Sequence, residues 1–95
     1  MFVIVLEYLK PLEEVNRWLE EHKSFLEEQY AGKRFIASGR LVPRTGGMIL
    51  ARGCDRAELD RILDRDPFKR EGVARYTVME FEPTMFDPAM APLLQ

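Results

Sequence analysis

Strand-type and helix-type segments follow one another along this chain in an order that only a few folds accept. Four segments are rich in β-branched and aromatic residues and predict strands. Two others show the periodicity of amphipathic helices. In chain order the six segments are strand 2–8, helix 12–30, strand 35–42, strand 48–52, helix 56–66 and strand 73–81. This βαββαβ order predicts the ferredoxin-like arrangement, an α+β fold in which two helices cover one face of a four-stranded antiparallel sheet.

Proline, glycine and capping residues mark the ends of these segments. Pro11 suits the first turn of the first helix, and Gly32 ends that helix. Asp55 caps the second helix, which Pro67 ends. Residues 43–47 supply a turn between the two middle strands, so these strands are expected to pair as a hairpin.

The composition is that of a small globular domain, and it restricts the partners of the chain. We expect one domain over residues 1–95, with 46% apolar and 32% charged residues. The net charge of −2 provides no basic excess for phosphates, so nucleic acid is not expected as a partner. Cys54 is the only cysteine, which fits a reducing, cytoplasmic setting. The apolar run of residues 2–6 is too short to span a membrane.

An apolar surface remains on the predicted sheet after both helices have packed on one face. Residues 2–6 are apolar at every position, and residues 73–81 carry apolar side chains on both sides. A chain of this length has no third layer for that surface, and such a patch marks an interface. We therefore expect a homodimer that packs sheet against sheet around a twofold axis. The alternative is a monomer whose C-terminal tail covers the open face.

That tail, residues 83–95, combines prolines with large apolar side chains. Pro83, Pro88 and Pro92 are expected to prevent a regular helix or a central strand, so we predict an extended segment. Its apolar side chains predict that it packs on protein, on the other subunit of the dimer. These side chains are Met85, Phe86, Met90, Leu93 and Leu94.

His22, the only histidine, lies in the middle of the apolar arc of the first helix. Its neighbours on the arc include Trp18 and Phe25. Burying a polar ring is unfavourable unless the ring finds a hydrogen-bond partner. His22 is therefore either a core residue bonded to backbone carbonyls or an imidazole with a function.

Asp66 is the candidate partner of His22, because it continues the apolar stripe of the second helix after Ile62 and Leu63. We expect it at the end of that helix, where the negative end of the dipole and partial desolvation favour a protonated or cation-paired acid. The alternative is an Asp-Pro turn, formed with Pro67, whose side chain binds nearby amides.

Ser38 and Gly39 lie inside a predicted strand, where both pack poorly. A glycine there indicates a bulge or a backbone approached by a ligand. A Ser-His-Asp relay is not favoured, because the chain has no Gly-x-Ser-x-Gly elbow and a strand serine is not presented as a nucleophile. We interpret Ser38 as an orienting residue or a ligand contact.

These residues together resemble the YciI-like (YCII-related) family over nearly the whole chain, from Met1 to Pro83. The matching motifs are His22, Ser38-Gly39-Arg40-Leu41, Asp66-Pro67-Phe68 and Gly72. The resemblance implies a dimeric α+β barrel whose active site is built on His22 and Asp66, with Ser38 beside them. The usual strand motif of the family is Ser-Gly-Pro-Leu. Arg40 replaces the proline here and is expected to place a cation near the pocket mouth.

A His-Asp pair can carry out proton transfer without a cofactor. A carboxylate bonded to one imidazole nitrogen fixes the tautomer and makes the other nitrogen more basic. Proton abstraction next to a carbonyl then leads to isomerisation or elimination, and Arg40 or Arg75 is a candidate to hold a carboxylate or enolate oxygen. With one histidine and neither an HxH nor a CxxC motif, no metal is expected. The glycines show no phosphate-binding pattern, and no cofactor is expected.

Two functions from different classes therefore stay open. The first is a cofactor-independent lyase or isomerase that acts on a small cyclic or aromatic metabolite. Its catalytic residues are His22 and Asp66, and its substrate contacts are Ser38, Gly39, Arg40 and Phe68. The second is a non-catalytic dimer that binds a small anionic molecule or serves as an interaction module.

Overall fold

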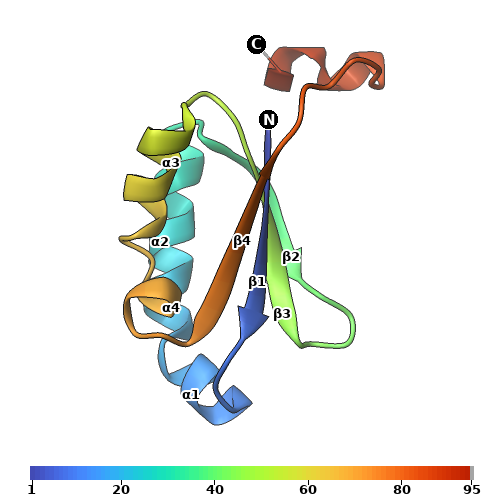
Figure 1. Cartoon of the computed structure of the whole chain (residues 1–95). Helices are drawn as coiled ribbons and strands as arrows, with labels where there is room; N and C mark the ends of the chain where they lie inside the picture. The colour runs from blue at the N-terminus through green and yellow to red at the C-terminus, as the bar shows by residue number, and fades with distance from the viewer. Residues whose placement is uncertain (95) are drawn as a thin grey trace.

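The computed structural model describes residues 1–94 and contains the predicted order of strands and helices, with further short elements. The elements are β1 (Phe2–Tyr8), α1 (Leu12–Arg17), α2 (Leu19–Ala31), β2 (Phe35–Arg40), β3 (Gly46–Ala51), α3 (Arg56–Leu63), α4 (Pro67–Arg70), β4 (Ala74–Glu80) and the 3₁₀ helix η1 (Pro88–Leu94). The strands form one antiparallel sheet in the order β2-β3-β1-β4. Helices α2, α3 and α4 pack on one face of it (Figure 1). The predicted α+β, ferredoxin-like fold is confirmed.

The core lies between this sheet and the helices, and the central strand β1 provides its middle. Phe2, Ile4 and Leu6 alternate toward the helices and are at most 2% exposed. Full burial of one such side chain stabilises a fold by roughly 1.5–3 kcal/mol. A slip of one residue would turn all three side chains to the other face and bring the smaller Val3 and Val5 to the core. The helices and the flanking segments complete the core with Val15, Phe25, Leu59, Leu63 and Phe68.

Strand β3 begins at Gly46, two residues before the predicted start, because two glycines that predicted a turn are part of the sheet. Gly46 pairs with Glu7, and Gly47 pairs with Leu6. A Cβ atom on Gly46 would lie 1.8 Å from the carbonyl oxygen of Leu6. Only glycine allows the two backbones to approach this closely, so its absence of a side chain serves strand pairing here.

The predicted single helix over residues 12–30 is two helices, α1 and α2, that meet at Trp18. The backbone of Trp18 has φ −102° and ψ 4°, and its N–H donates to the carbonyl of Val15 in a tighter turn. Helix α1 then crosses the end of the sheet while α2 runs along it (Figure 1). The apolar periodicity could not reveal this break, because a single tighter turn leaves the same side chains on the inner face.

The C-terminal tail was predicted to be extended throughout. This prediction is wrong for its last part, which forms η1. Asp87 begins this 3₁₀ helix: its carboxylate accepts the N–H of Ala89 and its carbonyl accepts the N–H of Met90, both at 2.8 Å. Short i→i+3 turns tolerate the missing N–H groups of Pro88 and Pro92. Gln95 lies outside the described residues.

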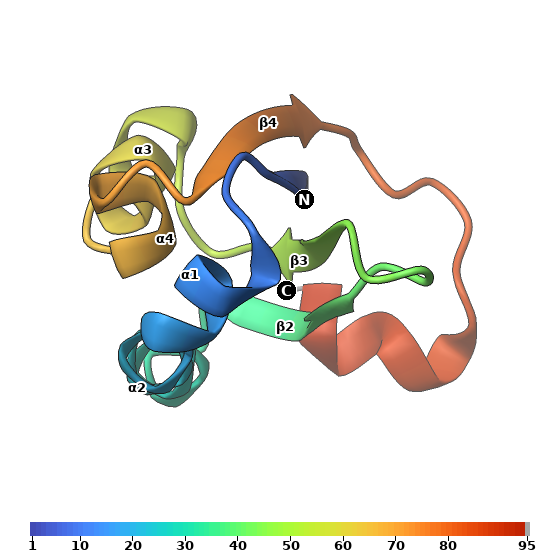
Figure 2. The ribbon, with the colours of Figure 1, turned by 90° about the horizontal axis from the view of Figure 1, so that it is seen from below.

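The open face of the sheet is apolar and stays uncovered by the tail. Met48 is 39% exposed, Met79 49% and Phe81 45%, and no residue of η1 is buried. Seen from below, the tail swings to the side of the sheet opposite the helices (Figure 2). The alternative of a monomer covered by its own tail therefore does not describe this structure. Within residues 1–94, no helix has the length and apolar character needed to cross a membrane.

Candidate active site

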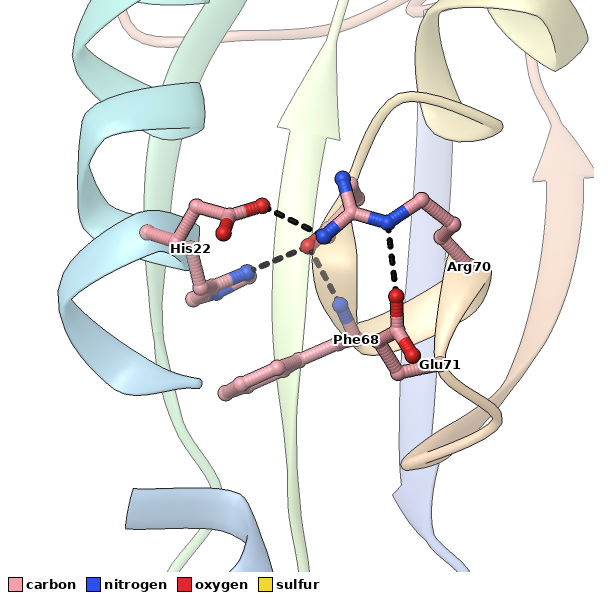
Figure 3. Close-up of polar contacts among 6 residues, drawn as sticks. His22, Phe68, Arg70 and Glu71 are labelled. Carbon is pink, nitrogen blue, oxygen red and sulfur yellow. Dashed lines mark hydrogen bonds and ion pairs between the residues drawn. The ribbon is translucent and has the colours of Figure 1, made fainter. Parts of the chain in front are cut away.

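His22 lies in the first turn of α2, where its side chain points toward α4. Its backbone N–H donates to the carbonyl of Trp18 at 3.0 Å, so the ring is held next to the break between α1 and α2. The Nδ1 atom of His22 lies 2.8 Å from Oδ1 of Asp66 (Figure 3). The histidine side chain is 11% exposed and the aspartate side chain 0%. This hydrogen bond is therefore shielded from water, and the imidazole has a side-chain partner rather than a backbone carbonyl.

Asp66 was predicted to end the second long helix. Instead, it is the capping residue at which α4 begins. Helix α3 stops at Leu63, and Pro67 occupies the first position of α4, which suits proline because no N–H is needed there. Oδ1 of Asp66 accepts the N–H of Phe68 at 3.0 Å as a helix cap. Asp66 thus lies at the positive end of a helical turn and not at the negative end of α3. The predicted Asp-Pro turn and the contact with His22 occur together, because Oδ1 accepts both donors.

A third donor, the hydroxyl of Tyr76, completes the surroundings of the Asp66 carboxylate by donating to Oδ2. An ionised carboxylate accepts hydrogen bonds and donates none. We therefore assign the proton of the neutral His22 ring to Nδ1, which leaves Nε2 as the free nitrogen.

Aromatic rings fix the plane of the His22 imidazole. The ring of Phe68 stacks on it, with centroids 3.9 Å apart and planes 3° apart. Phe25 stacks more loosely, at 6.5 Å and 28°. The edge of Tyr8 meets Phe68 at 6.2 Å. Phe68, predicted as a substrate contact, lines a pocket beside His22, but it is only 2% exposed because its ring is also part of the hydrophobic core.

A pocket of about 340 Å³ opens beside His22, between α2, the β2–β3 hairpin and α4. Its size falls within the range of small-molecule sites. Leu6, Leu19, Leu26 and Ile49 give it an apolar wall. Asp66 does not line it, so the carboxylate reaches the pocket only through the imidazole.

Three cationic side chains also line this pocket, and no aspartate or glutamate of the described residues does: the cations are Lys23, Arg40 and Arg44. Lys23 has a weak ion pair with Glu20 at 3.7 Å. Arg44 donates to Oδ1 of Asn16 at 2.8 Å. Arg40 makes no side-chain hydrogen bond or ion pair within residues 1–94, so its guanidinium is free for a ligand. The whole chain has a net charge of −2, whereas the charged side chains of this pocket wall are all positive.

Ser38 and Gly39, which are predicted substrate contacts, both line the pocket. Ser38 is not arranged as a nucleophile, and β2 has no bulge at Gly39. The hydroxyl of Ser38 is hydrogen-bonded to the hydroxyl of Tyr30 at 2.7 Å, and no bond joins it to His22 within the described residues. The irregularity of β2 lies between Phe35 and Ala37 instead of at Gly39.

Arg75 was predicted as a possible holder of substrate oxygen, and its place in the sheet rules this out. Side chains alternate along β4, so Tyr76 faces the helices and Arg75 the open face. There Arg75 pairs with Glu7 at 3.2 Å. The same alternation indicates that Tyr76 faces the helices, but Tyr76 was not predicted as a residue of the site. Arg44 was not predicted either, because it lies in a loop where no periodic pattern indicates the direction of its side chain.

Exposed ion pairs lie near the buried site, and two of them join α2 to α4 or to the segment before α4. Arg70 contacts Glu21 at 2.5 Å and Glu71 at 2.9 Å (Figure 3). Arg65 contacts Glu28 at 2.6 Å. Exposed pairs contribute about 0–1 kcal/mol each, so the buried hydrogen bonds of Asp66 dominate the connection.

The fold and the site define a class of protein: a small ferredoxin-like domain with a shielded His-Asp pair beside a ligand-sized, cation-lined pocket. The family model of the YCII-related domain matches residues 1–82, and the chain belongs to this family.

A solved structure resembles this fold, the 5-chloro-2-hydroxyhydroquinone dehydrochlorinase from Burkholderia phenoliruptrix AC1100 in complex with 2,5-dihydroxybenzoquinone. The TM-score is 0.71 at 17% sequence identity, over 86% of this chain and 94% of that chain. At this identity the likeness shows a common fold. No curated protein matches the chain.

Proposed function

We propose that this protein is a cofactor-independent lyase or isomerase in which His22 transfers protons to and from a small aromatic or cyclic metabolite. One observation carries the proposal: the 2.8 Å bond between Nδ1 of His22 and the buried Asp66 carboxylate, in an imidazole that lines a pocket. The dehydrochlorinase that shares the fold acts on a chlorinated hydroquinone by its name, which supports this class of substrate.

The chemistry follows from the free nitrogen of His22. Nε2 accepts a proton from a substrate hydroxyl or from a carbon next to a carbonyl, and Asp66 stabilises the imidazolium that forms. In an elimination, the electron pair of the broken bond moves into the ring and the leaving group departs with its own bonding pair. In an isomerisation, the imidazolium returns the proton to another atom. Neither reaction needs an oxidant or a metal.

The pocket wall favours a substrate with an acidic oxygen, such as a phenolate or a carboxylate. Lys23, Arg40 and Arg44 supply positive charge without a competing acid in the wall, and the apolar side chains suit a flat ring. Arg40 is the strongest candidate for the anion contact, because a free guanidinium can bind an oxygen pair in a bidentate way. It would also stabilise the enolate that proton removal creates.

Turnover and binding of two probes test the proposal. 2,5-Dihydroxybenzoquinone serves as the binding probe, and 5-chloro-2-hydroxyhydroquinone, kept free of oxygen, serves as the turnover probe with chloride release as the readout. His22→Gln and Asp66→Asn should each lower kcat/KM about 100-fold or more. Asp64→Asn is the matched control, because Asp64 is exposed and pairs with Lys69 outside the site. Wild-type turnover in both site variants would overturn the proposal.

The burial of the pair favours a second candidate, a small-molecule-binding module without turnover. An imidazole that is 11% exposed leaves little room for the reacting atoms of a substrate. This candidate predicts that the quinone probe binds the wild-type protein, that His22→Gln weakens binding, and that no chloride is released.

A further inference from the structure

Tyr76 contacts the residue on which the proposed base depends, yet it takes no part in the proton transfer. Its hydroxyl donates to Oδ2 of Asp66. The other oxygen, Oδ1, accepts from His22 and from the N–H of Phe68. Tyr76 does not line the pocket, so it does not touch a ligand there. We propose that Tyr76 is a positioning residue that fixes the Asp66 carboxylate and thereby holds the proton of His22 on Nδ1. The inference rests on the proposed function of the His22–Asp66 pair.

The sheet and a short connection bring Tyr76 to this place. Tyr76 lies opposite Leu6 in the β1–β4 register, on the face covered by helices. Gly72, with φ 67°, turns the chain from α4 into β4, and the N–H of Val73 donates to the carbonyl of Phe68 at 2.9 Å. Two independent elements, α4 and β4, therefore hold the two oxygens of one carboxylate.

Holding both oxygens matters because an aspartate side chain turns easily about its last bond. The terminal torsion of aspartate has broad minima. With only Oδ1 held, the carboxylate plane could rotate and lengthen the bond to Nδ1 of His22. Asp66 is 0% exposed, so no bulk water reaches Oδ2 while the Tyr76 hydroxyl is in place as its donor. The hydroxyl of Tyr76 is thus the group that fixes the plane.

The surroundings keep Tyr76 a donor. Burial, reinforced by the adjacent Asp66 carboxylate, raises the pKa of the Tyr76 phenol above its ordinary value. The hydroxyl therefore keeps its proton to a higher pH than an ordinary tyrosine. The Lys69 ammonium lies 6.0 Å from the centre of the Tyr76 ring.

The only histidine of the chain allows a test without any ligand. Nitrogen-15 NMR of a histidine-labelled sample reports the two ring nitrogens of His22 alone, at a pH where the ring is neutral. The wild-type protein should show Nδ1 protonated and Nε2 unprotonated. Tyr76→Phe should lose this single-tautomer signature, with both tautomers present, while melting stays cooperative. Tyr30→Phe is the matched control, because its hydroxyl bonds Ser38 and no atom of the pair, and it should keep the wild-type spectrum.

The outcomes separate this inference from the proposed function. A wild-type spectrum in folded Tyr76→Phe, together with mixed tautomers in Asp66→Ala, whose side chain accepts no hydrogen bond, would overturn the role of Tyr76 and leave the base in place. A wild-type spectrum in both variants would overturn the His22–Asp66 base as well. If Tyr76→Phe does not fold, the wild-type protein provides the second measurement. Its Tyr76 hydroxyl proton should be visible at low temperature, with a cross-peak to the β-protons of Asp66, and absence of this signal overturns the inference.

Discussion

Replacing Asp66 should destabilise the protein by an amount set by its three hydrogen bonds. The carboxylate is fully buried and accepts from Nδ1 of His22, the N–H of Phe68 and the hydroxyl of Tyr76. Asp66→Ala leaves three donors without a partner, at about 1–3 kcal/mol each. The imidazole can change tautomer and the hydroxyl can rotate, so we expect the lower half of the sum, about 3–6 kcal/mol. That is a large share of the 5–15 kcal/mol typical of a domain.

Asp66→Asn should cost much less, because the amide keeps the shape of the carboxylate. Its oxygen can still accept from His22 and from the N–H of Phe68, and its NH₂ group can donate to Tyr76 after the hydroxyl turns. Three charge-assisted bonds become neutral ones, and the loss is partly offset because a buried charge is removed. We expect a loss of about 1–2 kcal/mol.

Urea unfolding, followed by the fluorescence of the only tryptophan, measures both variants. The guanidinium groups of Arg17 and Arg70 lie 5.9 and 5.8 Å from the Trp18 ring, so the fluorescence reports on the contact between α1 and α4. All samples need one protein concentration, because association would shift the midpoint. Asp64→Ala, at an exposed position, should stay within about 0.5 kcal/mol of wild type. The reasoning is refuted if Asp66→Ala is no less stable than Asp66→Asn, or loses under about 1 kcal/mol.

Three further predictions follow from single contacts. The raised pKa of Tyr76 means that the folded protein keeps a proton that the unfolded chain releases above pH 10.0, so stability is present below that pH and is lost as pH rises. Tyr76→Phe should show a shallower alkaline loss than Tyr30→Phe, and equal slopes would contradict this. Arg40→Leu should weaken binding of the quinone probe about tenfold or more, whereas Arg75→Leu on the open face should not; calorimetry decides. Met79→Asp should convert the expected homodimer into a monomer in sedimentation, and a monomeric wild type at micromolar concentration would remove that expectation.

The fold could be predicted because the apolar periodicity and the residues that start or end helices agree along most of the chain. Pro11 and Asp55 stand next to the starts of α1 and α3, and the apolar run of residues 2–6 coincides with the central strand β1. The break at Trp18 could not be predicted, because one tighter turn leaves the side-chain pattern unchanged. The 3₁₀ helix that begins at Pro88 could not be predicted either, because its prolines equally fit an extended segment.

The contact between His22 and Asp66 could be inferred because both lie on inward-facing stripes. That Asp66 caps α4 could not be inferred, because an Asp-Pro pair is compatible both with the end of one helix and with the start of another. Tyr76 could have been found by alternation, because Arg75 and Tyr76 must face opposite sides of β4. Arg44 could not, because nothing local determines which way a loop side chain points.

One carboxylate caps α4 and holds the imidazole, which makes assembly of the site depend on a local folding step. A helix of four residues has no stability of its own. When α4 opens, Asp66 loses its place and His22 loses its partner, although the sheet stays intact. The amide proton of Phe68, bonded to the same oxygen as the imidazole, therefore exchanges with solvent when the site comes apart. Its exchange rate measures the fraction of folded molecules in which the pair is disassembled.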